Sequence, residues 1–193
     1  MVYISHMTNP LPENAQKVFE GVIFDIHQWE QELFDGTKRT FEAATRQSIV
    51  IMIPVVGDKI FVAKEEQPGR PPYFAVPAGF SEKSDKEPLD AAKRELKEET
   101  GLTSDDWELL DTYSLYPRMS VTDYIYVARN CQKTHEKKLD SGERQLEEHL
   151  YTFDEFIDLH DHEDFANFFL KHNLIHAKYD PMFKKELRKK LFG

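Results

Sequence analysis

The sequence predicts an α/β protein with a small antiparallel β unit near its N-terminus, and three segments carry this prediction. Residues 48–55 (SIVIMIPV) form a continuous apolar run, which is typical of a strand buried on both faces. Residues 87–100 have the apolar spacing of a helix, with Pro88 in the first turn and Gly101 just past the end. Asp35–Gly36 is a strong signal for a tight hairpin turn. Strand and helix signals therefore occur in one chain, which is the pattern of the α/β class.

The N-terminal part of the chain is predicted to form an extended arm followed by a β hairpin. Residues 1–16 are polar and contain Pro and Asn, whereas residues 17–34 alternate as a strand does. Residues 37–44 return as the partner strand after the Asp35–Gly36 turn. A unit this thin is not stable alone, so we expect it to pack on the rest of the chain or on a second subunit. We therefore take residues 1–46 as one region, the arm and hairpin unit.

The remaining segments predict a mixture of strands, loops and helices. Strands are expected at residues 59–66, 74–80, 107–117 and 121–130, loops at 65–73 and 132–145, and helices at 153–172 and 181–192. The last helix is amphipathic, and we read its basic face as a solvated surface. The expected regions after the hairpin unit are a main domain over residues 47–175 and a C-terminal amphipathic helix over 176–193.

Composition and net charge argue against several classes of protein. The chain has 193 residues, is 40% hydrophobic and carries a formal net charge of −10, which argues against a nucleic-acid binder with a basic stripe. No apolar run approaches the roughly 20 residues that span a bilayer, so we expect no membrane partner. The start of the chain lacks the features of a secretory signal, and one cysteine, Cys131, cannot form an internal disulfide. We expect a cytoplasmic protein.

The segment KRELKEETGL (93–102) places three carboxylates at the end of the expected helix. At about 100° per residue, Glu95, Glu98 and Glu99 fall on one side. Like charges at this spacing repel, and they lie at the negative end of the helix dipole. A divalent cation would relieve the repulsion, since Mg²⁺ prefers hard oxygen ligands. The alternative is an ordinary solvated helix end, and the tight turn of Pro77-Ala78-Gly79 just before the helix favours the cation site.

The segment 79–102 (GFSEKSDKEPLDAAKRELKEETGL) resembles the Nudix box, G-x5-E-x7-R-E-U-x-E-E-x-G-U, in which U is apolar. Every fixed position of the second half is matched, by Arg94, Glu95, Leu96, Glu98, Glu99, Gly101 and Leu102. The first half departs from the pattern, because Lys86 stands where a Glu is expected and Phe80 where a Gly is expected. Either Asp85 or Glu87 is available as a replacement carboxylate, so the departure bears on the loop more than on the cation site.

The resemblance implies a fold, a reaction class and a set of site residues. The fold is an α/β/α sandwich with a mixed sheet, and the substrates are nucleoside diphosphates linked to another group. By position in the motif, Glu95 and Glu99 would be the principal ligands of Mg²⁺ or Mn²⁺, with Glu98 in support and the Ala78 carbonyl as a further ligand. Arg94 would brace the loop through an ion pair. Residues 47–175 would be the catalytic domain.

Within the family, the chain is most similar to the ADP-ribose and ADP-sugar pyrophosphatases. The N-terminal hairpin unit matches one that such enzymes exchange within a homodimer to hold the adenosine. Pro117, fifteen residues beyond Leu102, matches a hallmark proline. The acidic segment before the last helices resembles a loop that carries a catalytic Glu, for which Glu143 is the candidate and Glu147 the next. The resemblance therefore implies a homodimer and a hydrolysis that yields AMP and a sugar phosphate.

Several basic and aromatic side chains are candidates for substrate binding. Arg70 and Arg118 are candidate phosphate clamps, because Arg makes bidentate phosphate contacts. Trp29 is a candidate for stacking on a base, with core or dimer packing as its alternative. Other readings remain open at this stage: a GDP-mannose or other nucleotide-sugar hydrolase, and a non-catalytic module that binds a nucleotide metabolite. An RNA-decapping enzyme is disfavoured by the net charge.

Overall fold

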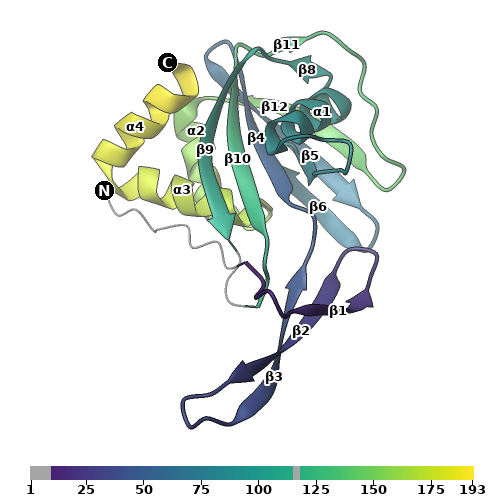
Figure 1. Cartoon of the computed structure of the whole chain (residues 1–193). Helices are drawn as coiled ribbons and strands as arrows, with labels where there is room; N and C mark the ends of the chain where they lie inside the picture. Colours follow the sequence, from purple (N-terminus) through teal and green to yellow (C-terminus); the bar gives the residue numbers. More distant parts are fainter. Residues whose placement is uncertain (1–9, 115–117) are drawn as a thin grey trace. The chain divides into compact units, whose positions relative to one another are not determined.

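The structure is a computed structural model that describes residues 10–114 and 118–193. Pro117 lies outside these residues. The chain forms two compact units, one of residues 1–49 and 112–123 and the other of residues 50–111 and 124–193. The described strands and helices are drawn in Figure 1, and the two units are described separately below.

The N-terminal β unit is an antiparallel sheet of β1 (Gln16–Glu20), β2 (Asp25–Glu32) and β3 (Lys38–Thr45) in that order. The Asp35–Gly36 turn joins β2 to β3 as expected, with Gly36 at a φ of 80°. The prediction of one strand over residues 17–34 is wrong, because the chain turns at residues 21–24. The Gly21 N–H donates to the Phe24 carbonyl at 3.1 Å, and a Cβ on Gly21 would lie 2.4 Å from that oxygen.

A buried ion pair between Arg46 and Asp123 stabilises the unit that contains the N-terminal β sheet. Arg46 Nη2 lies 2.6 Å from Asp123 Oδ2 and Arg46 Nη1 lies 2.8 Å from Oδ1, so the contact is bidentate. The side chains are only 7% and 2% exposed. The Ile49 N–H also donates to Asp123, at 2.8 Å. Asp123 therefore links the two stretches of chain that form this unit.

The main sheet of the described residues has seven strands and is mixed. Its central path is β12 (Arg144–Tyr151), β5 (Lys59–Gln67), β4 (Ile49–Val56), β10 (Thr122–Arg129) and β9 (Asp106–Ser114). β10 runs parallel to β4, whereas β5 is antiparallel to β4 and to β12. β6 (Arg70–Ala75) pairs with β5, and β7 (Ala78–Phe80) pairs with β4. The expected doubly buried strand is confirmed as β4, which is buried from Val50 to Val55.

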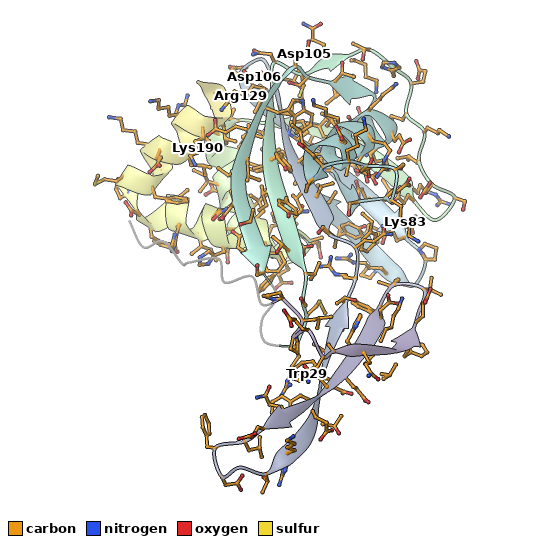
Figure 2. All side chains as sticks on the ribbon, in the orientation of Figure 1. Trp29, Lys83, Asp105, Asp106, Arg129 and Lys190 are labelled. Carbon is orange, nitrogen blue, oxygen red and sulfur yellow. The ribbon has the colours of Figure 1, made fainter. Side chains whose placement is uncertain are left out.

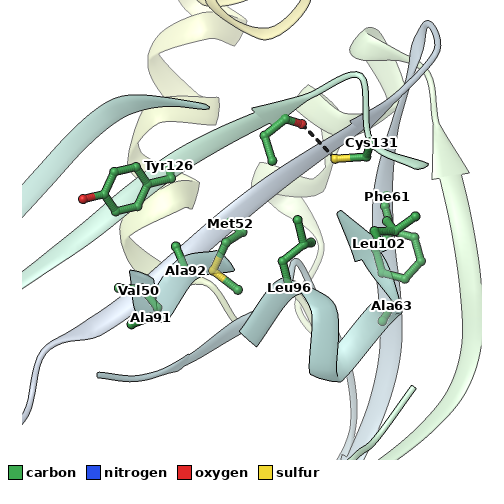
Figure 3. Close-up of a cluster of buried hydrophobic side chains, with 11 residues drawn as sticks. Val50, Met52, Phe61, Ala63, Ala91, Ala92, Leu96, Leu102, Tyr126 and Cys131 are labelled. Atoms are coloured by element: carbon green, nitrogen blue, oxygen red, sulfur yellow. Dashed lines mark hydrogen bonds between the residues drawn. The ribbon is translucent and has the colours of Figure 1, made fainter. Parts of the chain in front are cut away.

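Helices cover both faces of this sheet. Figure 1 shows α1 (Pro88–Thr100) on one face and α2 (Phe153–Asp158), α3 (Phe168–Tyr179) and α4 (Pro181–Phe192) on the other. The face toward α1 is a buried cluster that includes Met52 and Phe61 from the strands and Leu96 from the helix (Figure 3). Neighbouring strand residues, such as Ile51 and Ile53, point to the opposite face because side chains alternate along a strand. The predicted α/β/α sandwich with a mixed sheet and a small antiparallel N-terminal sheet is confirmed.

The start and the end of α1 follow the expected signals. Glu87 is the N-cap and forms a capping box with Asp90, and Pro88 occupies the first helical position. Gly101 ends the helix in the left-handed region, with φ 69°. A Cβ at Gly101 would lie 2.1 Å from the His135 carbonyl oxygen, so glycine is also required by the close approach of the later segment.

Three other predictions about elements are wrong. The expected loop at 65–73 is mostly the hairpin of β5 and β6, because Pro71 and Pro72 are tolerated in a strand that pairs on one side. Of the loop expected at 132–145, residues 132 and 133 form the short strand β11 and residues 144 and 145 begin β12. The expected helix at 153–172 is broken into α2, a short 3₁₀ turn at Leu159–Asp161 and the start of α3. Residues 175 and 176, where the expected main domain and C-terminal helix meet, lie within α3, and the expected division into domains stays a prediction.

Figure 2 marks Arg129, Asp106 and Lys190, which lie where β9, β10 and α4 meet. Arg129 Nη1 donates to Asp106 Oδ1 at 2.7 Å, and Nε donates to the Lys190 carbonyl at 2.8 Å. The expected last helix is therefore fixed to the sheet by a strand arginine. Within the described ranges, no helix is long enough and apolar enough to cross a membrane.

We expect Asp123→Asn to lower the free energy of unfolding by about 3 to 5 kcal/mol, because it leaves the buried charge of Arg46 uncompensated. Urea denaturation followed by circular dichroism measures this change. Asp25→Asn is the matched control, since Asp25 pairs with Lys17 at the surface of the same unit and such pairs contribute little. Equal stability of the two variants would contradict the assigned role of the buried pair.

Candidate active site

The first feature of the site is the turn that brings β7 against α1. The Met52 N–H donates to the Pro77 carbonyl at 2.9 Å, which fixes the turn to the central strand β4. A Cβ on Gly79 would lie 2.1 Å from the carboxyl carbon of Glu95. Only glycine therefore allows the backbone of β7 to approach the Glu95 side chain in its present position.

Arg94 braces the loop and the helix by a network of contacts. Its Nη2 donates to Asp85 Oδ2 at 3.0 Å and to the Phe80 carbonyl at 2.9 Å. Its Nη1 donates to Glu95 at 2.8 Å and to Glu98 at 3.3 Å. Burial opposes the charge of Arg94, but the hydrogen bonds to Asp85 and Glu95 offset this and raise its pKa above the usual value.

Asp85 takes the place of the carboxylate that is missing from the first half of the box. Hydrogen bonding to Arg94 is the main cause that lowers the pKa of Asp85, so this group is ionised at neutral pH. The other alternative, Glu87, is instead engaged in capping α1. The family pattern expects the carboxylate at position 86, where this chain has Lys86. Here the carboxylate that contacts Arg94 comes from Asp85, one position earlier.

Glu99 is the buried carboxylate of the cluster. It is only 8% exposed, and its Oε2 accepts the Ala78 N–H at 3.1 Å. Burial raises its pKa well above the ordinary value, and the charges of Glu65, Glu95 and Glu143 raise it further. Glu95 also has a raised pKa, mainly through burial, although Arg94 opposes this shift.

Glu99 and Glu143 line one small cavity of about 10 Å³, which is room for about one water. Glu143 comes just before β12, and burial raises its pKa as well. Glu143, the candidate chosen from the sequence, therefore lies beside Glu99 of the box. The next candidate, Glu147, lies on β12 with its side chain 51% exposed and contacts Lys64 at 3.3 Å. It does not line this cavity.

Glu65 is a residue of the site that reading the sequence missed. It lies on β5 and lines the same cavity as Glu99 and Glu143. A usable signal was present, because Glu65 has the same parity as Phe61 and Ala63, which face α1. Burial is the main cause that raises its pKa, and the polar side chains of Gln145 and Tyr73 act against the shift.

Arg70, expected as a phosphate clamp, begins β6 and stacks on Tyr73. Its guanidinium carbon is 3.9 Å from the centre of the ring. Its charge lowers the pKa of Glu65 slightly, so it lies within electrostatic reach of that carboxylate. The pKa of Tyr73 is raised to about 12, mainly by burial and then by the charge of Glu65.

Arg118 and Trp29 belong to the N-terminal β unit. Arg118 lies over the Phe41 ring at 4.8 Å and lines a groove of about 670 Å³, together with Phe41, Ile26 and Arg39 among others. Trp29 packs against Phe41 with ring centroids 6.2 Å apart and lies on β2 (Figure 2). Among the described residues, Phe41 contacts the Trp29 ring and the Arg118 guanidinium, and the groove is lined by apolar, cationic and acidic side chains.

The donor chemistry of the cluster fits a divalent cation. Carboxylate oxygens and the Ala78 peptide are hard ligands of the kind that Mg²⁺ prefers. Within residues 10–114 and 118–193, no three acidic, His or Cys side chains converge as a formed metal centre, and Glu95 and Glu98 face Arg94 instead. Glu99, however, is a buried carboxylate that forms no ion pair with a basic side chain within the described residues, and buried charges are normally paired or bound to metal. Glu95, Glu98, Glu99 and the Ala78 carbonyl are the groups that could hold the ion.

Comparison with family models shows which family the chain matches. The model described as NUDIX domain matches residues 45–172, which contain α1, the turn before it and the cavity carboxylates. The resemblance that the sequence carries at residues 79–102 is therefore confirmed over most of the chain.

Individual relatives agree with this match. The "ADP compounds hydrolase NudE" of Escherichia coli (strain K12) is 28% identical over 116 residues, which are 58% of this chain and 61% of that relative. A solved structure titled "Crystal structure of ADP compounds hydrolase" aligns with a TM-score of 0.70 and 23% identity, over 91% of this chain and 95% of that one. A NUDIX hydrolase from Nitrosomonas europaea aligns with a TM-score of 0.53 and 19% identity, over 68% and 89%. Both structures support the fold.

We expect the metal-free protein to lose stability as the pH rises through the raised pKa of Glu99. A carboxyl whose pKa is higher in the folded state stabilises the fold below its unfolded pKa, and this contribution disappears above its folded pKa. Thermal unfolding in the presence of a chelator, measured at pH values from 5 to 8, follows the effect. In Glu99→Gln the loss should be smaller, because the most deeply buried of the carboxyls with a raised pKa no longer ionises. An identical pH profile in the variant would show that Glu99 is not strained by its surroundings.

Proposed function

Because the chain belongs to the NUDIX domain family, we propose that it is a hydrolase that cleaves the pyrophosphate of ADP-ribose or a related ADP-sugar to AMP and a sugar phosphate. The observation that carries this proposal is the arrangement of Glu95, Glu98 and Glu99 on α1 against the Ala78 peptide. The similarity to the Escherichia coli relative, which is named as a hydrolase of ADP compounds, supports the choice of substrate class.

We propose Mg²⁺ or Mn²⁺ as the cofactor, held by Glu95, Glu98, Glu99 and the Ala78 carbonyl. When bound, the cation neutralises the two negative charges of the pyrophosphate and lowers the pKa of a coordinated water. An acidic protein needs this neutralisation, since the formal net charge is −10.

The remaining roles fall to side chains of the chain itself. Glu143 orients or deprotonates the attacking water, because it lines the cavity beside Glu99 on a segment anchored to α1. That anchor includes the hydrogen bond from the Lys138 N–H to the Glu98 carbonyl at 2.8 Å. Arg94 acts as a positioning residue that orients Glu95 and Glu98 and holds the loop through Asp85.

Three side chains are proposed to bind the substrate. Arg70 would contact a phosphate from β6, where its stacking on Tyr73 orients the guanidinium group. Arg118 and Trp29 would bind the nucleoside part of the substrate in the groove of the N-terminal β unit or beside it. The exposed apolar side chains of this unit, such as Val22 and Phe34, support our further proposal of a homodimer. We also propose a cytoplasmic location, since the only cysteine is a buried free thiol.

We expect ADP-ribose or ADP-glucose to be hydrolysed with Mg²⁺ faster than GDP-mannose or UDP-glucose. Glu99→Gln should lower kcat by about 100-fold or more while the fold persists, because it removes a carboxylate of the cation site. Product formation by chromatography, with circular dichroism of both proteins, tests this. Preference for GDP-mannose would replace ADP-sugars as the proposed substrate class. Full activity of Glu99→Gln would contradict the assignment of Glu99 to the cation site. If the wild type turned over no substrate with either ion, the next tests would be nucleotide binding without hydrolysis and substrates outside this panel.

We expect Gly79→Ala to lower kcat by about 100-fold, since the new Cβ displaces the Glu95 carboxylate and a shift of this size is costly in a positioned site. Gly142→Ala is the matched control, because it adds the same methyl group where nothing lies within 4 Å. Steady-state kinetics of both variants on the best substrate give the comparison. Equal activity of the two variants would show that the position of Glu95 is not required.

A further inference from the structure

Asn167 is a buried polar residue at the start of α3, with only 8% of its surface exposed. It occupies the N-cap position of α3, and Asn is among the residues that most often cap a helix with their own side chain. Here the side chain makes no capping hydrogen bond to α3. Its Oδ1 instead accepts the N–H of Val76, 91 residues earlier in the chain, at 2.8 Å. The side chain of Asn167 therefore serves a distant segment and not its own helix.

The contact with Val76 continues a short stretch of backbone pairing along the edge of β6. The Phe74 N–H donates to the Asp164 carbonyl at 2.9 Å, and the Phe74 carbonyl accepts the Ala166 N–H at 2.8 Å, as in a parallel bridge. In a parallel ladder the next N–H on this edge is that of Val76. Because the chain enters α3 at this point, the side-chain carbonyl of Asn167 takes the place of a backbone acceptor.

Val76 lies directly before the turn that contains the proposed cation ligand, the Ala78 carbonyl. Pro77 fixes its own φ and restricts the residue before it to extended conformations, so the backbone of this turn has little freedom. A backbone N–H of β4 donates to the Pro77 carbonyl at 2.9 Å, and Glu99 accepts the Ala78 N–H at 3.1 Å. Asn167 holds the residue at which the turn begins, so its bond to Val76 helps to set the position of the Ala78 peptide.

We propose that Asn167 is a positioning residue of the active site, which fixes residues 76–78 so that the Ala78 carbonyl is held in place for the cation. The proposal rests on the proposed function, because the assignment of this carbonyl as a ligand gives the turn its role. Val76 is only 1% exposed, so the loss of Asn167 would leave a buried N–H without its acceptor. The turn would then shift or open to satisfy that group, because an unpaired buried donor is costly.

The test compares Asn167→Leu with Asn173→Leu in the full chain. Asn173 is the matched control, because it is a buried Asn of the same helix, 5% exposed, whose side chain donates to Asp111 on β9 at 3.4 Å. Hydrogen exchange of the metal-free proteins is followed by NMR, with amides of β10 as the reference for global opening. Relative to these, we expect the Val76 and Ala78 amides to exchange about 10-fold faster or more in Asn167→Leu, and as in the wild type in Asn173→Leu.

Two further measurements connect the turn to the cation. The Kd for Mn²⁺ without substrate, from the electron paramagnetic resonance signal of the free ion, should rise by about 10-fold in Asn167→Leu, as is typical when a group that orients a ligand is lost. With saturating Mg²⁺, kcat for the best ADP-sugar should fall by a similar factor while KM changes by less than about 3-fold, because the proposed substrate-binding side chains are unaltered. Asn167→Asp should restore both values, since it keeps an acceptor oxygen, and a negative charge is favourable at a helix N-terminus.

Equal amide exchange and equal Mn²⁺ affinity in Asn167→Leu and Asn173→Leu would overturn the proposal, as would a failure of Asn167→Asp to restore them. If Asn167→Leu does not fold, Asn167→Ser replaces it, because Ser suits a helix N-cap but has a shorter side chain than Asn. Wild-type exchange and affinity in Asn167→Ser would overturn the proposal too.

The same experiment separates this inference from the proposed function. Hydrolysis by the wild type with unaltered kcat and Kd in Asn167→Leu would reject the positioning role alone. Faster exchange and weaker Mn²⁺ binding in Asn167→Leu, without hydrolysis of any ADP-sugar by the wild type, would reject the proposed hydrolysis alone. Absence of Mn²⁺ binding by the wild type would overturn the role of Asn167 toward the cation.

Discussion

The buried carboxylate of Glu99 is the constraint on which the rest of the site depends. Only 8% of this residue is exposed, and the other groups of the site surround it. The helix dipole is unfavourable there, and the neighbouring charges of Glu65, Glu95 and Glu143 are also negative. One backbone N–H, from Ala78, is the compensation that the turn before α1 provides. A helix end selected only for stability would not collect these groups, and the cation proposed above would offset their mutual repulsion.

Arg94 contacts a carboxylate of the loop although the first half of the box departs from the family pattern. The guanidinium of Arg94 has several donors in a fixed fork, so it can reach a carboxylate that lies one residue away from the usual place. Asp85 is that carboxylate, and the Phe80 carbonyl accepts a second bond from the same side chain. The loop can therefore tolerate the change because the requirement is for a charge at one point in space, not for a Glu at one position in the sequence.

The cavity joins three parts of the chain that are distant in sequence. β5 brings Glu65, α1 brings Glu99, and the segment before β12 brings Glu143. The last of these is held by contacts at the end of α1, where the Gly101 carbonyl accepts the Thr134 N–H at 3.0 Å and the His135 N–H at 3.2 Å. Gly101 thus both ends the helix and admits the segment that carries Glu143, which is why one residue serves the fold and the site together.

The sequence by itself determined the box helix, its cap and its end, the doubly buried strand, the hairpin turn and the family, because these depend on local spacing and on backbone preferences. It misplaced the turn at Gly21, the hairpin around Pro71 and Pro72, and β12, because strands at the edge of a sheet are fixed by their partners and not by their own composition. Only the tertiary structure decided that Asp85 and not Glu87 meets Arg94, and that Glu143 and not Glu147 lines the cavity beside Glu99, where Glu65 joins them. The physical reason is that charges interact through space, and the pairing of β5 with β12 sets which carboxylates share a buried cavity.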